Sequence, residues 1–455
     1  MAIVTNRLKK QVIKSLQADF NLASEDYYAV IGRSQDWNDS DVAPTAVNTQ
    51  REERNFRLSA QSGKAIVDLS FVVPRYNWSS GAIYSAYDDA QVGYPAQTYY
   101  VINDNNQVYM CIQQSKNASG NAQVSTVQPS GNTTGVPFDT ADGYIWKFLY
   151  SISALDATKF VSANYLPVKL QGATNPDSPA PDVEQLAVQT AAVSGQIIGY
   201  YVDSGGAGYT SDPTITVVGN GTKAKAGATT SGGQVVKVEL IDSSGSYTLG
   251  SGYDFANVVV SGGGSPSKPA AVRAILSTPL GLGGDPRDDL RSTAIMFNVK
   301  PEGDVDGDFI VGNDFRQVGL MKGLKDSAAG VDFTEANGKF LKQLDLSSVT
   351  SGFTADNTIQ GATSNIKALI DRADSGGNGG IWYHQTEETG FGDFAAGENI
   401  TEIDGNGAGV LNASITPYIE PEIDAFSGEL LYLDNRAAVT RSTDQTEDIK
   451  IVIQI

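Results

Sequence analysis

Short runs of β-branched and aromatic residues, separated by turns rich in glycine, asparagine and proline, restrict most strongly how this chain can fold. Such runs occupy residues 27–32, 65–73 and 143–150, and an alternating run closes the sequence at 448–455. With 48 glycines and only 18% charged residues, the composition is typical neither of a disordered polyelectrolyte nor of a helical bundle. We therefore predict a mainly β, multi-domain, β-sandwich-like architecture with a few short helices.

One hairpin and several more strands follow from the same pattern. Two apolar runs flank Asn-Asp-Asn-Asn at 103–106, and we expect a hairpin there because these residue types tolerate left-handed turn geometry. The other expected strands lie at 99–102, 107–112, 293–299, 315–320 and 428–433.

Helical spacing is clearest near the start of the chain, where apolar side chains recur on one face and basic side chains on the other. Thr5 or Asn6 is expected to cap this helix, which either packs on its own domain or is reserved for a partner. Shorter helices are expected at 182–192 and 365–372. The apolar residues of the first helix are Leu8, Val12, Ile13, Leu16 and Phe20.

The chain is long enough for several domains: at roughly 150 residues per domain, 455 residues leave room for about three. We predict an N-terminal β-rich domain at 1–195, an inserted Gly-rich β module at 196–278, and a C-terminal β-rich domain at 279–455 that packs with the first.

The module contains an imperfect duplication, since Gly208-Tyr209 recurs as Gly252-Tyr253, 44 residues later. Each copy is expected to supply two or three short strands, too few to bury a core alone, so the two copies would form one small sandwich. The expected strands lie at 214–218, near Ala224, at 257–260 and at 270–275.

The charge balance bears on possible partners. Acidic residues outnumber basic ones by 52 to 32, which gives a net charge of −20, and such a surface repels phosphate backbones. Residues 1–6 show no secretory leader pattern, and no apolar run approaches the ~20 residues that span a bilayer. We expect a protein made in a cytoplasm, without nucleic-acid or membrane partners.

The sequence offers little for metal or nucleophilic chemistry. Cys111 is its one cysteine and His384 its one histidine, which excludes an internal disulfide and a Cys/His zinc site. No nucleophile motif surrounds His384, and its neighbours Trp382 and Tyr383 are expected to be packing residues. The carboxylates at 304–308 lack the glycine and glutamate positions of a calcium loop, and no P-loop pattern occurs. We predict no catalytic residue, metal, cofactor or small-molecule substrate.

A group of tyrosines in the first third of the chain has two interpretations. Aromatic side chains supply much of the buried area of cores and subunit interfaces, which is the interpretation we favour. Exposed tyrosines on a β-rich acidic protein can instead bind sugars. The residues are Tyr84, Tyr87, Tyr94, Tyr99 and Tyr100.

Six stretches, taken in their order along the chain, carry a resemblance to a known family. They are IGRSQDW at 31–37, VVPRYNW at 72–78, VYMCI at 108–112, DGYIWKFL at 142–149, FRQV at 315–318, and a tail with SGELLYLDNR at 427–436 and DQTEDI at 444–449. Together they resemble the baseplate wedge subunit encoded by the eighth gene of T-even-type contractile-tailed phages. The resemblance covers 1–165 and 290–455, so the Gly-rich module looks like an insertion.

The resemblance implies a non-enzymatic structural protein of the virion, located in the tail baseplate and assembled in the host cytoplasm. It would form a homodimer and join other wedge subunits, and six wedges would close around the tail hub. The residues that match the family's motifs, as structural or interface candidates, are Arg33, Trp37, Pro74, Arg75, Trp78, Trp146, Arg316, Arg436 and Asp444.

Two questions stay open at the level of sequence. The four arginines among these residues sit beside aromatic or acidic residues, where planar bidentate pairing would fix either loops within the chain or contacts with a neighbouring subunit. The competing function is a tail-associated protein that binds or cleaves glycans, which the tyrosine content and the inserted module favour.

Overall fold

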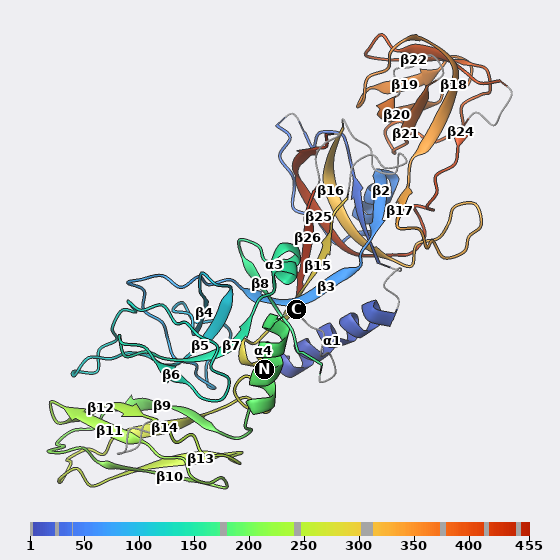
Figure 1. The fold of residues 1–455 in the computed structure, drawn as a ribbon. Helices are drawn as coiled ribbons and strands as arrows, with labels where there is room; N and C mark the ends of the chain where they lie inside the picture. Colours follow the sequence, from blue (N-terminus) through green and yellow to red (C-terminus); the bar gives the residue numbers. More distant parts are fainter. Residues whose placement is uncertain are drawn as a thin grey trace. The chain divides into compact units, whose positions relative to one another are not determined.

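The computed structural model describes residues 3–22, 27–38, 40–172, 180–240, 247–301, 313–373, 379–413, 418–442 and 447–455. Over these residues the chain is mainly β, with several antiparallel sheets and short helices, which confirms the predicted fold class (Figure 1). The chain divides into two compact units. Unit 1 contains residues 1–10, 70–296 and 453–455, and unit 2 contains residues 11–69 and 297–452.

The boundary between the units falls inside four elements: the helix α1 (Asn6–Leu22) and the strands β3 (Asp68–Pro74), β15 (Ala294–Val299) and β26 (Ile449–Gln454). The first helix is therefore where the spacing predicts it, and the Thr5 hydroxyl caps it by accepting a hydrogen bond from the Leu8 N–H. Ile13 and Phe20 are buried, whereas Leu8 is 54% exposed and Val12 46% exposed.

Unit 1 contains a four-stranded sheet in the order β4-β5-β7-β6. The predicted hairpin joins β4 to β5, and Asn106 adopts a left-handed φ of 57° at the turn. The helix α4 lies against β7 and contributes Val188 to a core built mainly from tyrosine, tryptophan and phenylalanine side chains. The bounds are β4 (Tyr100–Ile102), β5 (Gln107–Gln113), β6 (Phe138–Asp139), β7 (Ile145–Ser151) and α4 (Ala180–Ala191).

Three further elements complete this part of unit 1. The strand β8 (Tyr165–Val168) pairs with the unit 1 residues of β3, and the helices α3 (Ala154–Phe160) and α5 (Pro286–Asp289) are short. Ser153 caps α3 and Asp285 caps α5, each through its side-chain oxygen.

The Gly-rich module also belongs to unit 1 and forms a small two-layered β structure. One sheet has the order β12-β11-β10-β13, the other pairs β14 with β9, and their apolar side chains share one core. The equivalent strands of the two sequence copies, β10 and β13, lie side by side in antiparallel register from Thr214↔Ser261 to Gly219↔Ala256. The bounds are β9 (Ile197–Ser204), β10 (Thr214–Gly219), β11 (Gly227–Ser231), β12 (Gln234–Glu239), β13 (Ala256–Ser261) and β14 (Ala271–Leu276).

Unit 2 contains a five-stranded sheet in the order β17-β2-β1-β16-β25. The helix α2 (Gln50–Leu58) packs on it through Phe56, which is fully buried with Tyr28, Val30 and Met321. The bounds are β1 (Tyr27–Gly32), β2 (Ala60–Ala65), β16 (Asp314–Lys322), β17 (Asn337–Lys339) and β25 (Glu429–Thr440).

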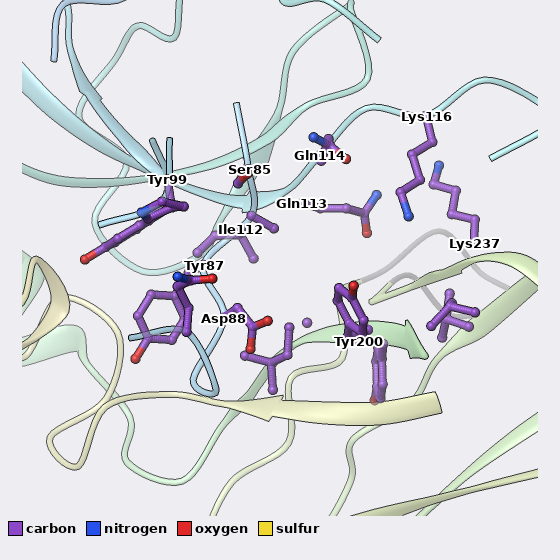
Figure 2. Close-up of a pocket in the computed structure, with 18 residues that line it drawn as sticks. Ser85, Tyr87, Asp88, Tyr99, Ile112, Gln113, Gln114, Lys116, Tyr200 and Lys237 are labelled. Carbon is purple, nitrogen blue, oxygen red and sulfur yellow. The ribbon is translucent and has the colours of Figure 1, made fainter. Parts of the chain in front are cut away.

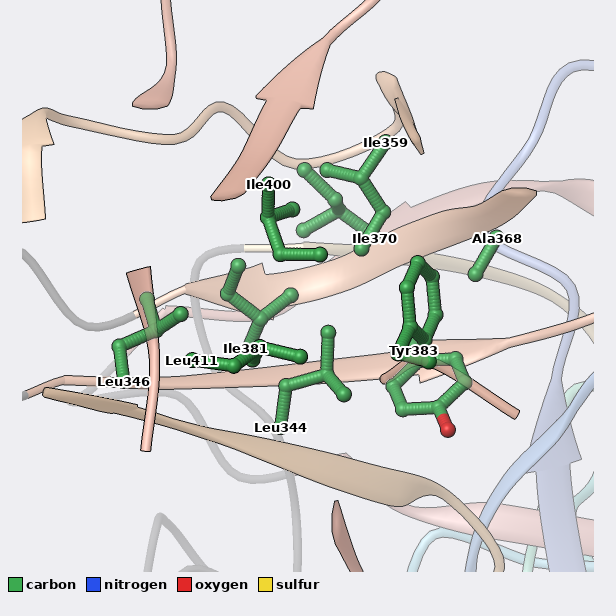
Figure 3. Close-up of a cluster of buried hydrophobic side chains, with 10 residues drawn as sticks. Leu344, Leu346, Ile359, Ala368, Ile370, Ile381, Tyr383, Ile400 and Leu411 are labelled. Carbon is green, nitrogen blue, oxygen red and sulfur yellow. The ribbon is translucent and has the colours of Figure 1, made fainter. Parts of the chain in front are cut away.

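The second sheet of unit 2 closes on itself. Its order is β21-β20-β19-β22-β23-β18-β24, and β21 pairs additionally with β18. Alternate side chains of these strands point inward, and Figure 3 shows Leu344, Ile370 and Ile381 meeting inside the ring. The bounds are β18 (Lys342–Ser351), β19 (Thr358–Gly361), β20 (Lys367–Ala373), β21 (Gly380–His384), β22 (Asn399–Glu402), β23 (Ala408–Leu411) and β24 (Tyr418–Ile419).

Some local predictions are wrong. Residues 365–372, expected as a helix, mostly form β20, because Ala368 and Ile370 are both buried and alternate across the strand with period two. The expected single strand at 65–73 is split, since β2 ends at Ala65 and β3 begins at Asp68. The strand expected near Ala224 begins only at Gly227.

Candidate functional site

Three of the six stretches that carry the resemblance meet in the five-stranded sheet of unit 2. β1 contributes 31–32, β16 contributes 315–318 and β25 contributes 429–436, with Gly32 paired to Gln317 and Gln317 paired to Asn435. Just after β1, the guanidinium of Arg33 lies over the Trp37 ring at 4.3 Å. The Trp37 indole N–H then donates to the carbonyl of Arg436 at 2.8 Å. These contacts tie the loop after β1 to the edge strand β25.

Arg316 is the most heavily bonded of these arginines, although its side chain is only 5% exposed. It donates through Nη2 to Asp36 (2.5 Å) and through Nε to Asp41 (2.8 Å), and it also bonds the Ser34 carbonyl. The Arg316 guanidinium holds the pKa of Asp41 below its usual range through this hydrogen bond. Arg316 therefore fixes the loop after β1 from within the same chain. Arg436 differs, since it is 43% exposed and lies 3.9 Å from Asp434.

The remaining described candidates lie in unit 1. Arg75 donates to Asn77 Oδ1 (2.9 Å) and to the Ser162 carbonyl (3.0 Å), and the Pro74 carbonyl accepts from the Tyr100 hydroxyl (2.6 Å). These bonds fix the segment that follows β3.

The two tryptophans of unit 1 lie around one aromatic cluster. Trp146 is fully buried in β7 and stacks on Tyr144 with ring centroids 5.7 Å apart. Trp78 packs at the margin of the cluster and donates to Ser125 Oγ at 3.1 Å. Asp444 and the acidic stretch at 304–308 lie outside the described residues.

His384 lies at the end of β21 and is buried. Its Nδ1 lies 2.5 Å from Asp371 Oδ2, and Asp371 also accepts from Gln61 Nε2 at 3.1 Å. Nε2 of His384 has no hydrogen-bond partner among the described residues, so no hydroxyl or thiol is seen there for it to activate. Its neighbours Trp382 and Tyr383 are buried in hydrophobic clusters, as expected of packing residues.

A cavity of about 250 Å³ in unit 1 is a candidate ligand site (Figure 2). One wall comes from the segment 85–99 and the end of β5, and the other from β9, β12 and β14 of the Gly-rich module. Tyr87 and Tyr99 lie toward one end, and Lys116 and Lys237 lie together at the other. The expected role of the tyrosine group in core packing holds for Tyr87 and Tyr99, which are 7% and 1% exposed, yet both also line this cavity.

Side-chain bonds across the cavity hold its two walls in place. Arg273 of β14 makes a bidentate pair with Asp88, at 2.8 Å and 2.6 Å, and its guanidinium covers the Tyr201 ring at 4.5 Å. At the other end, Gln113 Nε2 donates to Glu239 Oε1 at 3.2 Å. Bidentate arginine pairs fix both distance and orientation, so the cavity is preformed.

The two lysines of the cavity differ in their partners. Lys237 forms an ion pair with Glu239. For Lys116 the described residues provide no ion pair or side-chain hydrogen bond, and burial, followed by the neighbouring Lys237 charge, lowers its pKa. Sequence reasoning missed this site because Lys116 and Lys237 are 121 residues apart and neither stands in a motif.

No family model matches the chain, and no curated protein matches it significantly. None of the described helices combines the length and apolar character needed to cross a membrane. Within the same described residues, no three histidine, cysteine, aspartate or glutamate side chains gather as a metal-binding group.

Proposed function

We propose that this protein is a non-enzymatic structural subunit of a phage tail baseplate wedge, which forms a homodimer and binds other wedge subunits in the virion. The single observation that carries the proposal is the spatial grouping of the six stretches that resemble the wedge subunit. Three of them share the sheet of β1, β16 and β25, and three lie together around β5 and β7.

The grouping matters because the stretches are far apart in sequence. In unit 1, Cys111 of β5 pairs with Trp146 of β7, and the Trp78 N–H donates to the Ile102 carbonyl at 2.9 Å in the adjacent strand. In unit 2, residues 33–37 contact residues 316 and 436. Apart from the 444–449 part of the tail, the stretches form two groups of contacting segments, which favours a shared origin over chance matches.

The contacts of the arginines support a role in assembly over one in catalysis. Arg316 and Arg75 bind loop carbonyls and carboxylates of their own chain, which gives rigid loops between strands. Rigid surface loops are suited to specific protein–protein contacts because little conformational entropy is lost when they bind. Arg436, at 43% exposure, remains available for such a contact.

The proposal is tested first on purified full-length protein by size-exclusion chromatography with light scattering. We expect a particle of about twice the 48.1 kDa chain mass. The full-length chain is then co-expressed with the proteins encoded by the neighbouring tail genes, and we expect it to co-purify with them. A capsid protein from the same genome is the matched control and should not co-purify.

The decisive measurement is a cryo-electron microscopy reconstruction of intact tails from the virus that encodes the chain. We expect density for this fold in each sector of the baseplate. A strictly monomeric protein that binds no tail protein and is missing from purified particles would overturn the proposal.

A further inference from the structure

We propose that the cavity between β5 and the Gly-rich module binds a sugar that carries a carboxylate, such as a hexuronic acid. The inference rests on the cavity alone, and it does not depend on the proposed role in a baseplate. Four features of the lining specify the ligand: its size, its cationic end, its free hydrogen-bond acceptors and its aromatic rings.

The size of the cavity indicates a small ligand. Its volume of about 250 Å³ lies just below the roughly 300–1,000 Å³ of sites that hold drug-sized molecules. The Arg273–Asp88 and Gln113–Glu239 bonds link the two walls, so the walls cannot separate without breaking half-buried bonds. A single sugar ring is compatible with this space, whereas a folded peptide segment is not.

The cationic end supplies the binding group for an anion. In a chain with a net charge of −20, Lys116 and Lys237 lie side by side. The charge of Lys237 is offset by Glu239, but none of the described carboxylates pairs with Lys116. A partly buried ammonium without a counterion is unfavourable, and a ligand carboxylate would supply the missing charge-assisted hydrogen bond.

The acceptors around the cavity distinguish an acidic sugar from a simple anion. Gln113 and Gln114 use their amide N–H groups on Glu239 and on the Tyr84 carbonyl. Their side-chain oxygens accept no bond from the described residues and are available to a donor on a ligand. Sugar hydroxyls supply such donors, whereas acetate has none.

Tyrosine rings in the cavity lining also fit a sugar. Tyr87 and Tyr200 line the same cavity as the lysines, and sugars present apolar C–H faces that pack against aromatic rings. The ligand we infer therefore directs its carboxylate to Lys116, its hydroxyls to the glutamine oxygens and one ring face to a tyrosine.

The experiment measures ligand binding to the full-length protein by saturation-transfer NMR and calorimetry. Glucuronate is the probe, glucose is the matched neutral sugar and acetate is the anion without a ring. We expect glucuronate to bind, and glucose and acetate to bind at least about tenfold more weakly, because each lacks one set of contacts. Equal binding of acetate, or no binding of glucuronate, would overturn the proposal.

Three variants test the assigned residues. Lys116→Gln should weaken glucuronate binding about tenfold and leave glucose binding unchanged, whereas Lys116→Arg should retain most of the affinity. Lys268→Gln, which removes an exposed lysine of the same module outside the cavity, is the control and should change nothing. Unchanged glucuronate binding by Lys116→Gln would overturn the assignment of Lys116. If the glutamine variant does not fold, the glucuronate affinity of Lys116→Arg provides the test instead.

A last comparison distinguishes the end of a polysaccharide from a free sugar acid as the ligand. An oligosaccharide that ends in glucuronate should bind at least as well as glucuronate itself if the site receives the end of a polysaccharide. Binding of the monosaccharide alone would support the site and identify its ligand as a free sugar acid.

Discussion

Tyr209 and Tyr253 hold the two copies of the Gly-rich module together by reciprocal contacts. The Tyr209 hydroxyl accepts a hydrogen bond from the Ala270 N–H at 2.9 Å, in the other copy, and the Tyr253 hydroxyl accepts one from the Ala224 N–H at 3.4 Å. Both rings are nearly buried, at 6% and 5% exposure. Each copy therefore supplies the aromatic side chain that closes the core of its partner copy.

Glycines of the opposite copy make room for these rings, and this gives the first prediction. A Cβ on Gly263 would lie 2.7 Å from Cδ1 of Tyr209, too close without movement of the ring. We expect Gly263→Ala to lower the free energy of unfolding by about 1–3 kcal/mol through overpacking, in addition to the backbone penalty. Calorimetric melting of the full-length protein measures the change.

The neighbouring glycine provides the matched control. Gly262 has a φ of 74°, close to the 76° of Gly263, but a Cβ added to Gly262 would have no atom within 4 Å. Gly262→Ala should therefore show only the backbone penalty of about 1–2 kcal/mol for an L-residue at positive φ. Equal losses for the two variants would contradict the packing role of Tyr209.

Sequence patterns predict the secondary-structure elements that depend on neighbouring residues. They fail where contacts between residues distant in sequence determine the structure. The hairpin at 103–106 and the duplicated module follow from turn residues and repetition. The helix α2 was missed although Thr49 accepts from the Glu52 N–H at its start, because Phe56 and Leu58 are its only large apolar residues. Most of residues 365–372 form a strand because β20 pairs with β19 and β21 inside a closed sheet, and these pairings have no local sequence signal.

The candidate sites show the same limit. Arg316 could be selected from the sequence as a bidentate residue, but its partners Asp36 and Asp41 lie 280 and 275 residues away, and only the pairing of β1 with β16 brings them together. The cavity with Lys116 and Lys237 needs the module to pack on the end of β5, which no motif encodes.

Arg316 should be far more important for stability than Arg436. Arg316→Met removes a guanidinium with 5% exposure and leaves the Ser34 carbonyl and nearby carboxylates without their donor, so we expect a loss of about 2–4 kcal/mol. Arg436→Met removes one exposed contact of 3.9 Å and should change stability by less than about 0.5 kcal/mol. Urea unfolding followed by tryptophan fluorescence compares them. Similar losses would argue against an internal role for Arg316.

Cys111 should report the opening of the β5–β7 sheet. The thiol is fully buried, and burial raises its pKa well above the usual range, so the reactive thiolate is scarce in the folded protein. We expect a disulfide reagent to modify the folded chain at least about a hundredfold more slowly than the chain in guanidinium. Cys111→Ser should not react at all. Rapid modification of the folded protein would mean that this sheet opens readily.

The free energy of unfolding should depend on pH through Asp289. Burial raises its pKa to about 7, although hydrogen bonds from Thr278 Oγ1 (2.6 Å) and the Gly283 N–H (2.8 Å) act in the opposite direction. In the unfolded chain the carboxyl titrates near 3.9. Between these values the folded state keeps a proton that the unfolded state releases, so stability contributed by Asp289 is present below about pH 4 and is lost as the pH rises to about 7.

The contribution of Asp289 to stability is isolated by comparing the wild type with Asp289→Asn. Asp289→Asn removes the titration, so the free energy of unfolding of the wild type, minus that of the variant, should fall between pH 4 and pH 7 by at most about 1.4 kcal/mol per pH unit. Asp288→Asn is the control, because this neighbouring carboxylate is 35% exposed and paired with Lys10. Curves for wild type and Asp289→Asn that run parallel over this range would show that the buried carboxyl does not take up a proton on folding.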